Sequence, residues 1–597
     1  MSIFANKFYK ASILLGGAGL IFYLFEFNTP TDLTDNVYEK KKFDHSIFSH
    51  VKFSEKSTAL GINYVHHMYA NKSDLSVEPV STSTSVLDIN SDGWMDLFIT
   101  TSAHHPNLLY INHGGKYFTE EAAKFGLGED NGDSDPSYAF WGDFNNDGNL
   151  DLLLGKYGCH KFYLGDKKHQ FTDKSQWLKG YCSKPNGINA ADFYNHGKLD
   201  IIFSNFLPYE KIDLAKALWM ANTRYDNVSG GENHLLKNMG DHFEVEKNAN
   251  FLTHSYSHNA GIADINLDGR YDIFFSNDYA HDEMFLNKGN GFFEDVTNKY
   301  IPKEFHGLSG MNTEFFDYDN DGLVDLYVTN IFKPPFNRHF NLLWKKKADG
   351  TFTNVSHDVN NAKCGFSWGA KFADIDNDGE ADLFVVNGRS RSGEVKSKND
   401  GRSMWYERHE VSQIPWFLKK FYRPIETLKG RYISAFERKC LFMQKEGKFF
   451  DIAPDASFDD REENRGLALI DYDNDGKMDA ITSGPMAKLK IYHNETKISG
   501  LNHWIGFELI DQFGSTIPHG AILSTTILDK KIIRQEFPAN GYKGFNDPRV
   551  HLGLGEASKL DYVDVFWPLS RVTKRYRNLK TDQYNKLSER SSNEIIK

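Results

Sequence analysis

A short acidic pattern recurs along this chain of 597 residues. It reads D-x-[DN]-x-D-G-x-x-D and leads directly into an alternating apolar run, as in "DYDNDGLVDLYVTN" (317–330). So many carboxylates repel one another unless a cation lies between them. Oxygen atoms of positions 1, 3, 5 and 9, with the carbonyl of position 7, are the hard ligands that Ca²⁺ prefers. Glycine at position 6 permits the sharp turn that directs these oxygens to one point.

The pattern therefore predicts calcium sites in six loops. The side-chain ligands are Asp88, Asn90, Asp92 and Asp96; Asp143, Asn145, Asp147 and Asp151; Asp264, Asn266, Asp268 and Asp272; Asp317, Asp319, Asp321 and Asp325; Asp374, Asp376, Asp378 and Asp382; and Asp471, Asp473, Asp475 and Asp479. The carbonyl ligands are those of Trp94, Asn149, Arg270, Leu323, Glu380 and Lys477. A weaker seventh copy begins at Asp192, but Tyr194 and His196 occupy its ligand positions, so we assign no ion to it.

Two other interpretations compete with these calcium loops. A solvated turn rich in Asp, Asn and Gly would explain any single copy, but the repetition favours calcium. An EF-hand needs a bidentate Glu at position 12. The residues at that position are Ile99, Leu154, Phe203, Phe275, Val328, Val385 and Thr482, which excludes EF-hands.

The spacing of the copies indicates the elements that must hold them. Successive copies begin 49 to 97 residues apart, which is typical of propeller blades built from four short strands. A second hairpin ending in an aromatic residue follows four of the loops, at Phe118, Phe171, Phe293 and Phe352. Each repeat therefore contains two β-hairpins, and the chain is predicted to be all-β.

These loops resemble FG-GAP (VCBS) repeats, the integrin-type β-propeller family. The resemblance implies a seven-bladed β-propeller over residues 51–498, because the pattern occurs seven times. Residues 52–67 resemble the second half of a blade and residues 471–494 the first half, so we expect the two ends to pair and close the ring. The stretches "HWIGFELI" and "GYKGFNDPRVHLGLGEASKLDYVDVFWP" resemble an ASPIC/UnbV module, which implies a small β-rich domain over residues 499–590.

The N-terminus indicates the compartment. Residues 8–27 contain 18 uncharged residues of 20, which predicts one transmembrane helix acting as a signal-anchor. Lys7 and Lys10 favour a cytoplasmic location for residues 1–7, with residues 28–50 as a linker. A cleaved signal peptide is the alternative. In both cases the propeller is expected on the exported side, periplasmic or extracellular.

Four cysteines fit an oxidising compartment. Cys159 and Cys182 flank one hairpin, and Cys364 and Cys440 flank a long insertion, so we favour these two disulfides among three possible pairings. Free buried thiols are the alternative.

Two insertions follow the strand after the loop, at about 205–232 and 389–439, and equivalent positions place both on the same face of the ring. Residues 210–224 have the periodicity of a short amphipathic helix. The second insertion has thirteen Lys or Arg against six Asp or Glu. Its centre provides a candidate partner-binding set: Trp416, Phe417, Lys419, Lys420, Phe421, Tyr422 and Arg423. Aromatic and basic residues together suit a protein, glycan or lipid surface.

Catalysis has weaker support in the sequence. The pairs His66–His67 and His104–His105, and the cluster Asp278, His281, Asp282 and Glu283, provide acid, base or metal-binding groups. No nucleophile elbow, HExxH or phosphate loop occurs. The net charge of −12 does not suggest nucleic acid. We therefore expect a membrane-anchored, calcium-binding scaffold, with an exported enzyme acting at the propeller channel mouth as the alternative.

Overall fold

The computed structural model describes residues 8–16, 19–27, 45–66, 82–129, 131–209, 230–247, 249–250, 254–278, 280–333, 337–389, 402–403, 431–432, 434, 436–592 and 594–596. Within them the chain forms strands and loops, with one short α-helix, α3 (Thr297–Tyr300). The remaining helical turns are 3₁₀: η1 (His45–Phe48), η2 (Ala122–Phe125), η3 (Ser175–Leu178) and η4 (Lys303–Phe305). The predicted all-β class is confirmed.

Seven antiparallel sheets follow one another, and in each the inner strand leads through an acidic loop to the second strand. From the axis outward, blades one to three contain β4 (Thr84–Leu87), β5 (Asp96–Ile99), β6 (Leu108–Asn112) and β7 (Phe118–Glu120); β8 (Pro136–Gly142), β9 (Asp151–Lys156), β11 (Lys161–Gly165) and β12 (Phe171–Asp173); and β14 (Pro185–Ala191), β15 (Asp200–Asn205), β16 (His234–Asn238) and β17 (Phe243–Val245). Blades four and five contain β18 (Ser257–Ala263), β19 (Asp272–Asn277), β20 (Glu283–Asn287) and β21 (Phe293–Asp295); and β22 (Thr313–Phe316), β23 (Asp325–Val328), β26 (Leu342–Lys346) and β27 (Phe352–Asn354). Blades six and seven contain β28 (Ser367–Ala373), β29 (Asp382–Asn387), β32 (Cys440–Lys445) and β33 (Lys448–Asp451); and β34 (Gly466–Ile470), β35 (Asp479–Ser483), β36 (Lys490–Asn494) and β3 (Phe53–Glu55).

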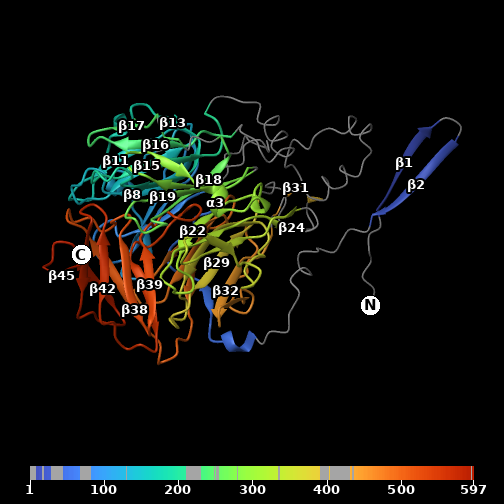
Figure 1. Cartoon of the computed structure of the whole chain (residues 1–597). Helices are drawn as coiled ribbons and strands as arrows, with labels where there is room; N and C mark the ends of the chain where they lie inside the picture. Colours follow the sequence, from blue (N-terminus) through green and yellow to red (C-terminus); the bar gives the residue numbers. More distant parts are fainter. Residues whose placement is uncertain are drawn as a thin grey trace.

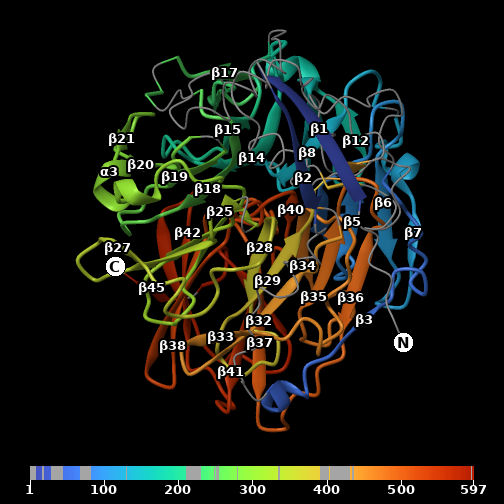
Figure 2. The same cartoon turned by 90° about the vertical axis from the view of Figure 1, so that its right-hand side faces the viewer.

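The inner strands close a ring. Neighbouring blades touch through β4, β8, β14, β18, β22, β28 and β34, and β34 returns to β4. Blade seven takes its outer strand from the other end of the propeller, with Phe53 opposite Asn494 and Glu55 opposite Tyr492. The expected pairing of the two ends is therefore present: β3, which precedes the first blade in the chain, completes the last blade beside β36 (Figure 2).

Residue size explains the order of the strands within a blade. Inner strands such as β14 and β18 are buried along their whole length and are rich in Ala, Gly, Ser and Asn, because both of their faces meet a neighbouring blade near the crowded axis. Each outer strand instead has one buried aromatic residue at its first or second position, followed by half-buried or exposed residues. The aromatic positions are Phe118, Phe171, Phe243, Phe293, Phe352, Phe449 and Phe53.

The C-terminal module consists of two sheets beside the ring (Figure 1). One contains β41 (Val550–Gly555), β37 (His503–Ile510) and β44 (Tyr584–Ser588). The other contains β39 (Lys530–Gln535), β38 (Ile522–Ile527), β42 (Val563–Trp567), β43 (Val572–Tyr576) and β45 (Glu594–Ile596). Their facing apolar side chains, including Phe507, Leu523 and Trp567, form a separate core.

One segment of this module enters the propeller axis. The axial segment, residues 536–547, contains β40 (Gly544–Phe545), which pairs in parallel with β4. Its polar atoms reach the other six inner strands. The contacts are Tyr138 OH to the Gly544 carbonyl (3.0 Å), Asn189 Nδ2 to Asn540 Oδ1 (2.9 Å), Asn259 Nδ2 to the Gly541 carbonyl (2.6 Å), Gly541 N to the Thr313 carbonyl (2.8 Å), Lys371 Nζ to the Asn540 carbonyl, and Leu469 N to Asn546 Oδ1 (3.0 Å). The module is thus bonded to all seven blades.

Two disulfides join the predicted cysteine pairs, Cys159–Cys182 and Cys364–Cys440. The first spans a small sheet of β10 (Gly158–Cys159) and β13 (Cys182–Ser183). The other two-stranded sheets are β24 (Phe332–Lys333) with β25 (Asn337–Arg338), and β30 (Arg402–Ser403) with β31 (Arg431–Tyr432).

The N-terminal helix prediction is wrong. Instead, β1 (Phe8–Gly16) and β2 (Gly19–Phe27) pair in antiparallel, with Gly16 opposite Gly19. Glycines at the centre of the segment disfavour a continuous helix, and its aromatic and β-branched residues favour strands. In the described part of the chain, none of the helices combines the length and apolar character that a membrane crossing requires.

The insertions contain residues that the structure does not describe. The predicted amphipathic segment 210–224 and the candidate partner-binding residues 416–423 both lie outside the described residues. The strands that precede the insertions, β15 and β29, both run away from the acidic loops, so the insertions begin on the opposite face of the ring.

Gly544 provides a test of the docked axial segment. A Cβ atom at this position would lie 1.9 Å from the Leu467 carbonyl oxygen, which belongs to a rigid inner strand. We expect Gly544→Ala to lower the free energy of unfolding by about 1–3 kcal/mol, the usual cost of overpacking. Chemical denaturation would measure the change.

Gly500→Ala is the matched control, because nothing lies within 4 Å of its added Cβ. Equal stability of the two variants would contradict the docking of residues 536–547 in the axis.

Candidate metal centres

The aspartate at position 9 fixes each acidic loop to its blade. One carboxylate oxygen accepts the N–H of position 2, and the other accepts an N–H from the third strand. In the first blade these donors are Ile89 and Asn112, which donate to Asp96 over 3.0 and 2.7 Å. The same pair of bonds occurs at Asp151, Asp200, Asp272, Asp325, Asp382 and Asp479. All seven carboxylates are buried.

The aspartate at position 1 shapes the turn. Its two oxygens accept the N–H groups of positions 5 and 6, as in Asp88, which bonds Asp92 N at 3.0 Å and Gly93 N at 2.8 Å. Gly93 has φ 88°, in the left-handed region that side chains disfavour. The glycine requirement inferred from the sequence thus has a conformational cause.

Burial makes these carboxyl groups hold their protons more strongly than usual. It raises the pKa of Asp96 to about 8, of Asp325 to about 9 and of Asp479 to about 7. At position 1, burial raises the pKa of Asp143 and of Asp471 to about 7. A bound divalent cation reverses this preference, because it stabilises the charged form directly.

In three loops, carboxylate oxygens converge within 4.8 Å of one another. The groups are Asp317, Asp319 and Asp325; Asp374, Asp376 and Asp382; and Asp471, Asp473 and Asp475. At position 3 of each, the buried Oδ1 of Asp319, Asp376 or Asp473 accepts no hydrogen bond from the residues that the structure describes. Leaving such an atom unsatisfied is costly. These residues therefore fit the predicted calcium ion, which would supply the missing partner.

Basic side chains also approach these three loops. Lys345 Nζ contacts Asp319 Oδ2, His50 Nε2 lies 2.8 Å from Asp376 Oδ2, and His493 Nδ1 lies 3.2 Å from Asp479 Oδ1. Each loop has aspartate at positions 1, 3, 5 and 9. A second basic group reaches each loop: Arg534 Nη1 lies 3.9 Å from Asp317 Oδ2, Lys445 Nζ lies 3.5 Å from Asp378 Oδ2, and Lys477 Nζ lies 2.5 Å from Asp475 Oδ2. Basic side chains of the protein therefore offset part of the charge of these loops.

In the other three predicted calcium loops, asparagine stands at position 3. Its amide closes the loop internally: Asn90 Nδ2 donates to Asp92 Oδ2 over 3.0 Å, and Asn266 Nδ2 donates to Asp268 Oδ2 over 3.0 Å. The corresponding distance from Asn145 Nδ2 to Asp147 Oδ2 is 2.9 Å. Here the carboxylate at position 5 already has a side-chain donor.

The remaining loop, which begins at Asp192 in blade three, contains its own cationic group. His196 Nδ1 lies 2.9 Å from Asp192 Oδ1, and Nε2 lies 3.4 Å from Asp200 Oδ1 and 3.1 Å from the Asn238 carbonyl oxygen. Burial opposes the charged imidazole, but hydrogen bonds to the two carboxylates outweigh it and raise the pKa of His196 to about 10. The Tyr194 hydroxyl donates elsewhere, to Glu246 Oε2.

Position 4 has a role that the sequence analysis missed. Its residue has φ between 53° and 60° in all seven loops. In four blades its asparagine side chain donates to a carbonyl of the next loop: Asn146 to Gly197, Asn320 to Gly379, Asn377 to Gly476 and Asn474 to Gly93. The signal was present, because asparagine occupies position 4 in five of the seven copies and tolerates left-handed backbone.

The C-terminal module contacts the acidic loops of blades three to seven. Arg571 Nη1 donates to Asn195 Oδ1 and to the Gly269 carbonyl oxygen, and Gly555 N donates to the Asn377 carbonyl oxygen over 3.1 Å. Ile533 N donates to Asp317 Oδ2 over 3.1 Å, and Tyr584 OH donates to Asp471 Oδ2 over 2.8 Å. Arg549 Nη2 donates to the Asp471 carbonyl oxygen. Aspartates at position 1 are therefore shared between the loop and the module.

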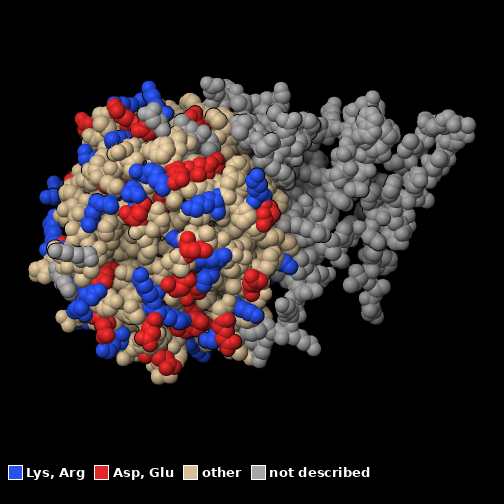
Figure 3. All heavy atoms as spheres, viewed as in Figure 1, with Lys and Arg blue, Asp and Glu red and all other residues tan. Residues whose placement is uncertain are grey.

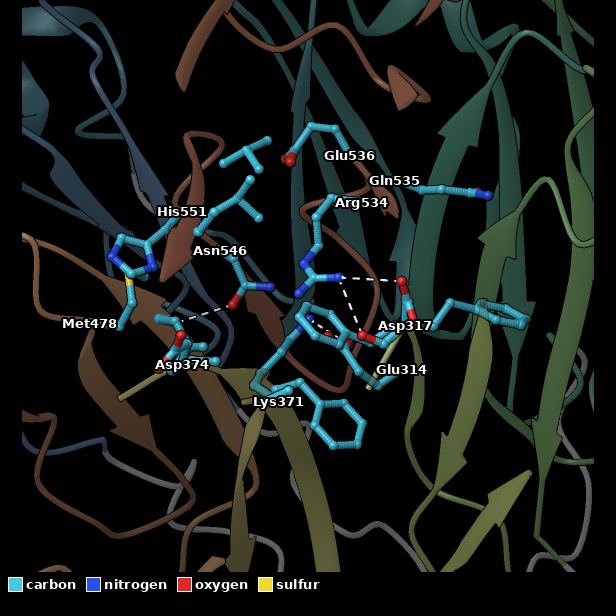
Figure 4. A pocket seen from close by; sticks show the side chains of 18 of the residues that line it. Glu314, Asp317, Lys371, Asp374, Met478, Arg534, Gln535, Glu536, Asn546 and His551 are labelled. Atoms are coloured by element: carbon cyan, nitrogen blue, oxygen red, sulfur yellow. Dashed lines mark hydrogen bonds and ion pairs between the residues drawn. The ribbon is translucent and has the colours of Figure 1, made fainter. Parts of the chain in front are cut away.

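A cavity of about 140 Å³ separates the module from blades five and six (Figure 4). Asp317 and Asp374 line it from the propeller, and Arg534 and His551 line it from the module. Arg534 Nη1 donates to the Asp317 carbonyl oxygen over 3.2 Å. Burial lowers the pKa of His551 to about 4, which makes it a neutral group at physiological pH. The cavity is a polar space next to two predicted metal loops.

The candidate catalytic residues have structural contacts. Asp282 Oδ1 accepts Asn277 N at 2.8 Å, Glu283 Oε2 accepts Asn277 Nδ2 at 3.1 Å, and the ring of His281 stacks on that of His306. None of the potential metal clusters in the described residues contains them. His66 bonds the Tyr64 hydroxyl, and His67 lies outside the described residues.

Known families match both parts of this architecture. The FG-GAP-like repeat family matches residues 88–154, 143–203 and 264–328, and the ASPIC and UnbV family matches residues 517–594. The chain therefore contains FG-GAP-like repeats followed by an ASPIC and UnbV region, as its motifs predicted.

Particular relatives match over shorter regions. The chain is 28% identical to cartilage acidic protein 1 of Xenopus tropicalis over 192 residues, covering 30% of this chain and 29% of that protein. It is 30% identical to cartilage acidic protein 1 of Mus musculus over 144 residues, covering 23% and 21%. The matched region thus spans less than a third of these relatives. A lectin structure from Agrocybe aegerita, described as recognising non-reducing terminal N-acetylglucosamine, is 16% identical, covers 52% of this chain and 75% of that chain, and has a TM-score of 0.34.

His196 predicts a pH-dependent contribution to stability. Its pKa is raised on folding, so its stabilisation is complete below about pH 6.5, the pKa of a free histidine, and is lost as the pH rises to about 10. We expect His196→Gln to lower the free energy of unfolding by about 1–3 kcal/mol at pH 6, because buried carboxylates lose their partner. Denaturation at a series of pH values would show the difference shrinking toward pH 10.

His242→Gln is the control, since His242 faces the exposed Asp241 in the same blade. A His196→Gln effect that is independent of pH would contradict the charged state of this imidazole.

Proposed function

We propose that this protein is an exported, calcium-binding propeller that serves as a binding module for a protein, glycan or lipid surface. The calcium part rests on the converging carboxylates of blades five to seven and on their buried oxygens without donors. Calcium would have a structural role there. When bound, it would supply positive charge to loops whose backbone the module contacts directly.

Two features support export, namely the disulfides and the apolar composition of residues 8–27. Both cysteine pairs form disulfides, which persist mainly in oxidising compartments. The strongly apolar composition of residues 8–27 is also typical of export segments. Membrane attachment is proposed from this apolar composition alone, because β1 and β2 pair in antiparallel where a helix was expected.

A binding role is favoured over an enzymatic one. The axial segment bonds the inner strands at the centre of the ring. The alternative function, an exported enzyme, would have its site at the mouth of a central channel. On the face shown in Figure 3, acidic and basic side chains are interspersed, which does not suggest a nucleic-acid surface. The basic and aromatic residues 416–423 remain the candidate docking set on the basis of their sequence.

Calcium binding predicts a stability difference. We expect the full chain to melt at a higher temperature in Ca²⁺ than in a chelator with Mg²⁺ added. One site that is specific for the native state adds about 2.7 kcal/mol when free calcium exceeds its Kd 100-fold. Scanning calorimetry would measure the shift, and elemental analysis would count bound calcium. Identical melting with no bound calcium would refute the calcium role.

The docking set has a separate test. We expect simultaneous alanine substitution of Trp416, Phe417, Lys419 and Lys420 to abolish retention of the partner. The measurement is mass spectrometry of material that co-purifies stoichiometrically with the protein from its native source.

Alanine substitution of Leu528, Lys530 and Lys531 is the control, because these exposed residues lie in the C-terminal module. Equal retention by both variants would exclude residues 416–423 as the docking surface.

A further inference from the structure

The two disulfides lie in different surroundings. Cys364 and Cys440 are completely buried in the core between blades five and six. By contrast, Cys159 is exposed and Cys182 is half-buried. Disulfides that solvent reaches exchange readily with thiols, whereas buried structural disulfides resist attack. Accessibility therefore distinguishes Cys159–Cys182 as the reactive pair of the two.

The accessible disulfide joins two strands that have little else to hold them together. β10 follows the second strand of blade two, and β13 precedes the first strand of blade three. They form a sheet of their own, in which Cys159 stands opposite Cys182 and Gly158 stands opposite Ser183. A two-stranded ribbon of this length has almost no stability of its own in water. The covalent bond therefore supplies most of the constraint between β10 and β13.

A chain of contacts leads from this disulfide to the propeller axis. Tyr157, two residues before Cys159, donates its hydroxyl hydrogen to Asn186 Oδ1 over 2.5 Å. Asn186 lies in β14, and its Nδ2 is 2.9 Å from His258 Nδ1. The ring of His258 meets that of Tyr542 edge to face, with 5.6 Å between the centroids. Because Tyr542 belongs to the axial segment, the chain joins the disulfide to the docked C-terminal module.

Burial makes this chain of contacts costly to break. Asn186 is 7% exposed and His258 is 3% exposed, so a lost partner leaves a polar atom with little access to water. The disulfide keeps the first contact short-range, because Tyr157 and Asn186 each lie within four residues of a bridged cysteine. Without the bridge, these two residues are 29 positions apart in the chain. Their contact then depends on the packing of blades two and three alone.

Reduction of the accessible disulfide needs only a dithiol. A thiolate of the dithiol attacks Cys159 Sγ, the sulfur–sulfur bond breaks, and Cys182 leaves as a thiolate that takes up a proton. The second thiol of the reductant then attacks the mixed disulfide and releases Cys159. The protein gains two electrons and two protons, and the dithiol becomes a disulfide.

We infer that Cys159–Cys182 is a thiol–disulfide exchange site for a dithiol reductant, and that its opening loosens the contacts from Tyr157 to the axial segment while the fold persists. The buried pair, Cys364–Cys440, keeps blade six intact during this exchange. The inference assigns the two disulfides different roles, one reactive and one structural, and it does not depend on calcium.

The test of reactivity is reduction of the full chain with dithiothreitol under native conditions. Alkylation at intervals, followed by peptide mass spectrometry, measures the opening of each cysteine pair. We expect Cys159–Cys182 to open at least about 10-fold faster than Cys364–Cys440, with the circular dichroism unchanged. Equal rates, faster opening of the buried pair, or unfolding when the first pair opens would overturn the inference.

Hydrogen exchange tests the link to the axis. We expect amide hydrogens in β14 and in residues 536–547 to exchange faster in the reduced, alkylated protein than in the oxidised protein. Tyr157→Phe keeps the disulfide but removes the bond to Asn186, so it should accelerate exchange in the same segments. Tyr117→Phe, which alters an exposed ring in blade one, is the matched control and should not. Unchanged exchange in the reduced protein or in Tyr157→Phe would contradict the link.

Discussion

A buried aspartate that accepts two backbone N–H groups holds each acidic loop to its blade, and the rest of the structure depends on this interaction. The two donors come from separate segments, for example Ile89 in the loop and Asn112 at the end of the third strand. Replacing the carboxylate would leave two buried N–H groups without partners, which is among the more expensive local defects in a protein. Because the bond recurs in all seven blades, the loops share one conformation on one face of the ring.

That regular face gives the C-terminal module a surface on which to dock. The module inserts residues 536–547 along the axis, where polar groups of the inner strands, such as Tyr138 and Asn259, need hydrogen-bond partners. Asn540 bonds blade three with its side-chain oxygen and blade six with its backbone carbonyl. The ring and the module therefore satisfy each other's buried polar groups, and their stabilities are coupled.

The negative charge of the acidic loops opposes folding, because neighbouring carboxylates repel one another. Asymmetry among the blades shows that the chain uses several chemical means to offset it. An asparagine amide removes one charge and donates a hydrogen bond, the His196 imidazolium provides a positive charge within its loop, and Lys345, His50 and His493 contact carboxylates of the loops with four aspartates.

The sequence by itself determined the repeating part of this protein. Local patterns at a regular spacing predict the aspartate at position 9, the glycine turn, the outer-strand aromatics and the pairing of the two ends. The favoured cysteine pairs flank a hairpin and a long insertion. Hydropathy did not determine the form of residues 8–27, because an apolar run with central glycines is compatible with either a helix or a hairpin. The tertiary structure alone decided the path of residues 536–547, the position of His196 between two carboxylates and the asparagine links between neighbouring loops. Each of these features depends on a contact partner in another blade or elsewhere in the chain. The sequence separation of such partners is irregular, so no periodic pattern predicts it. For the axial segment, Gly544 meets Leu467 and Tyr138, which are 77 and 406 residues away in the chain.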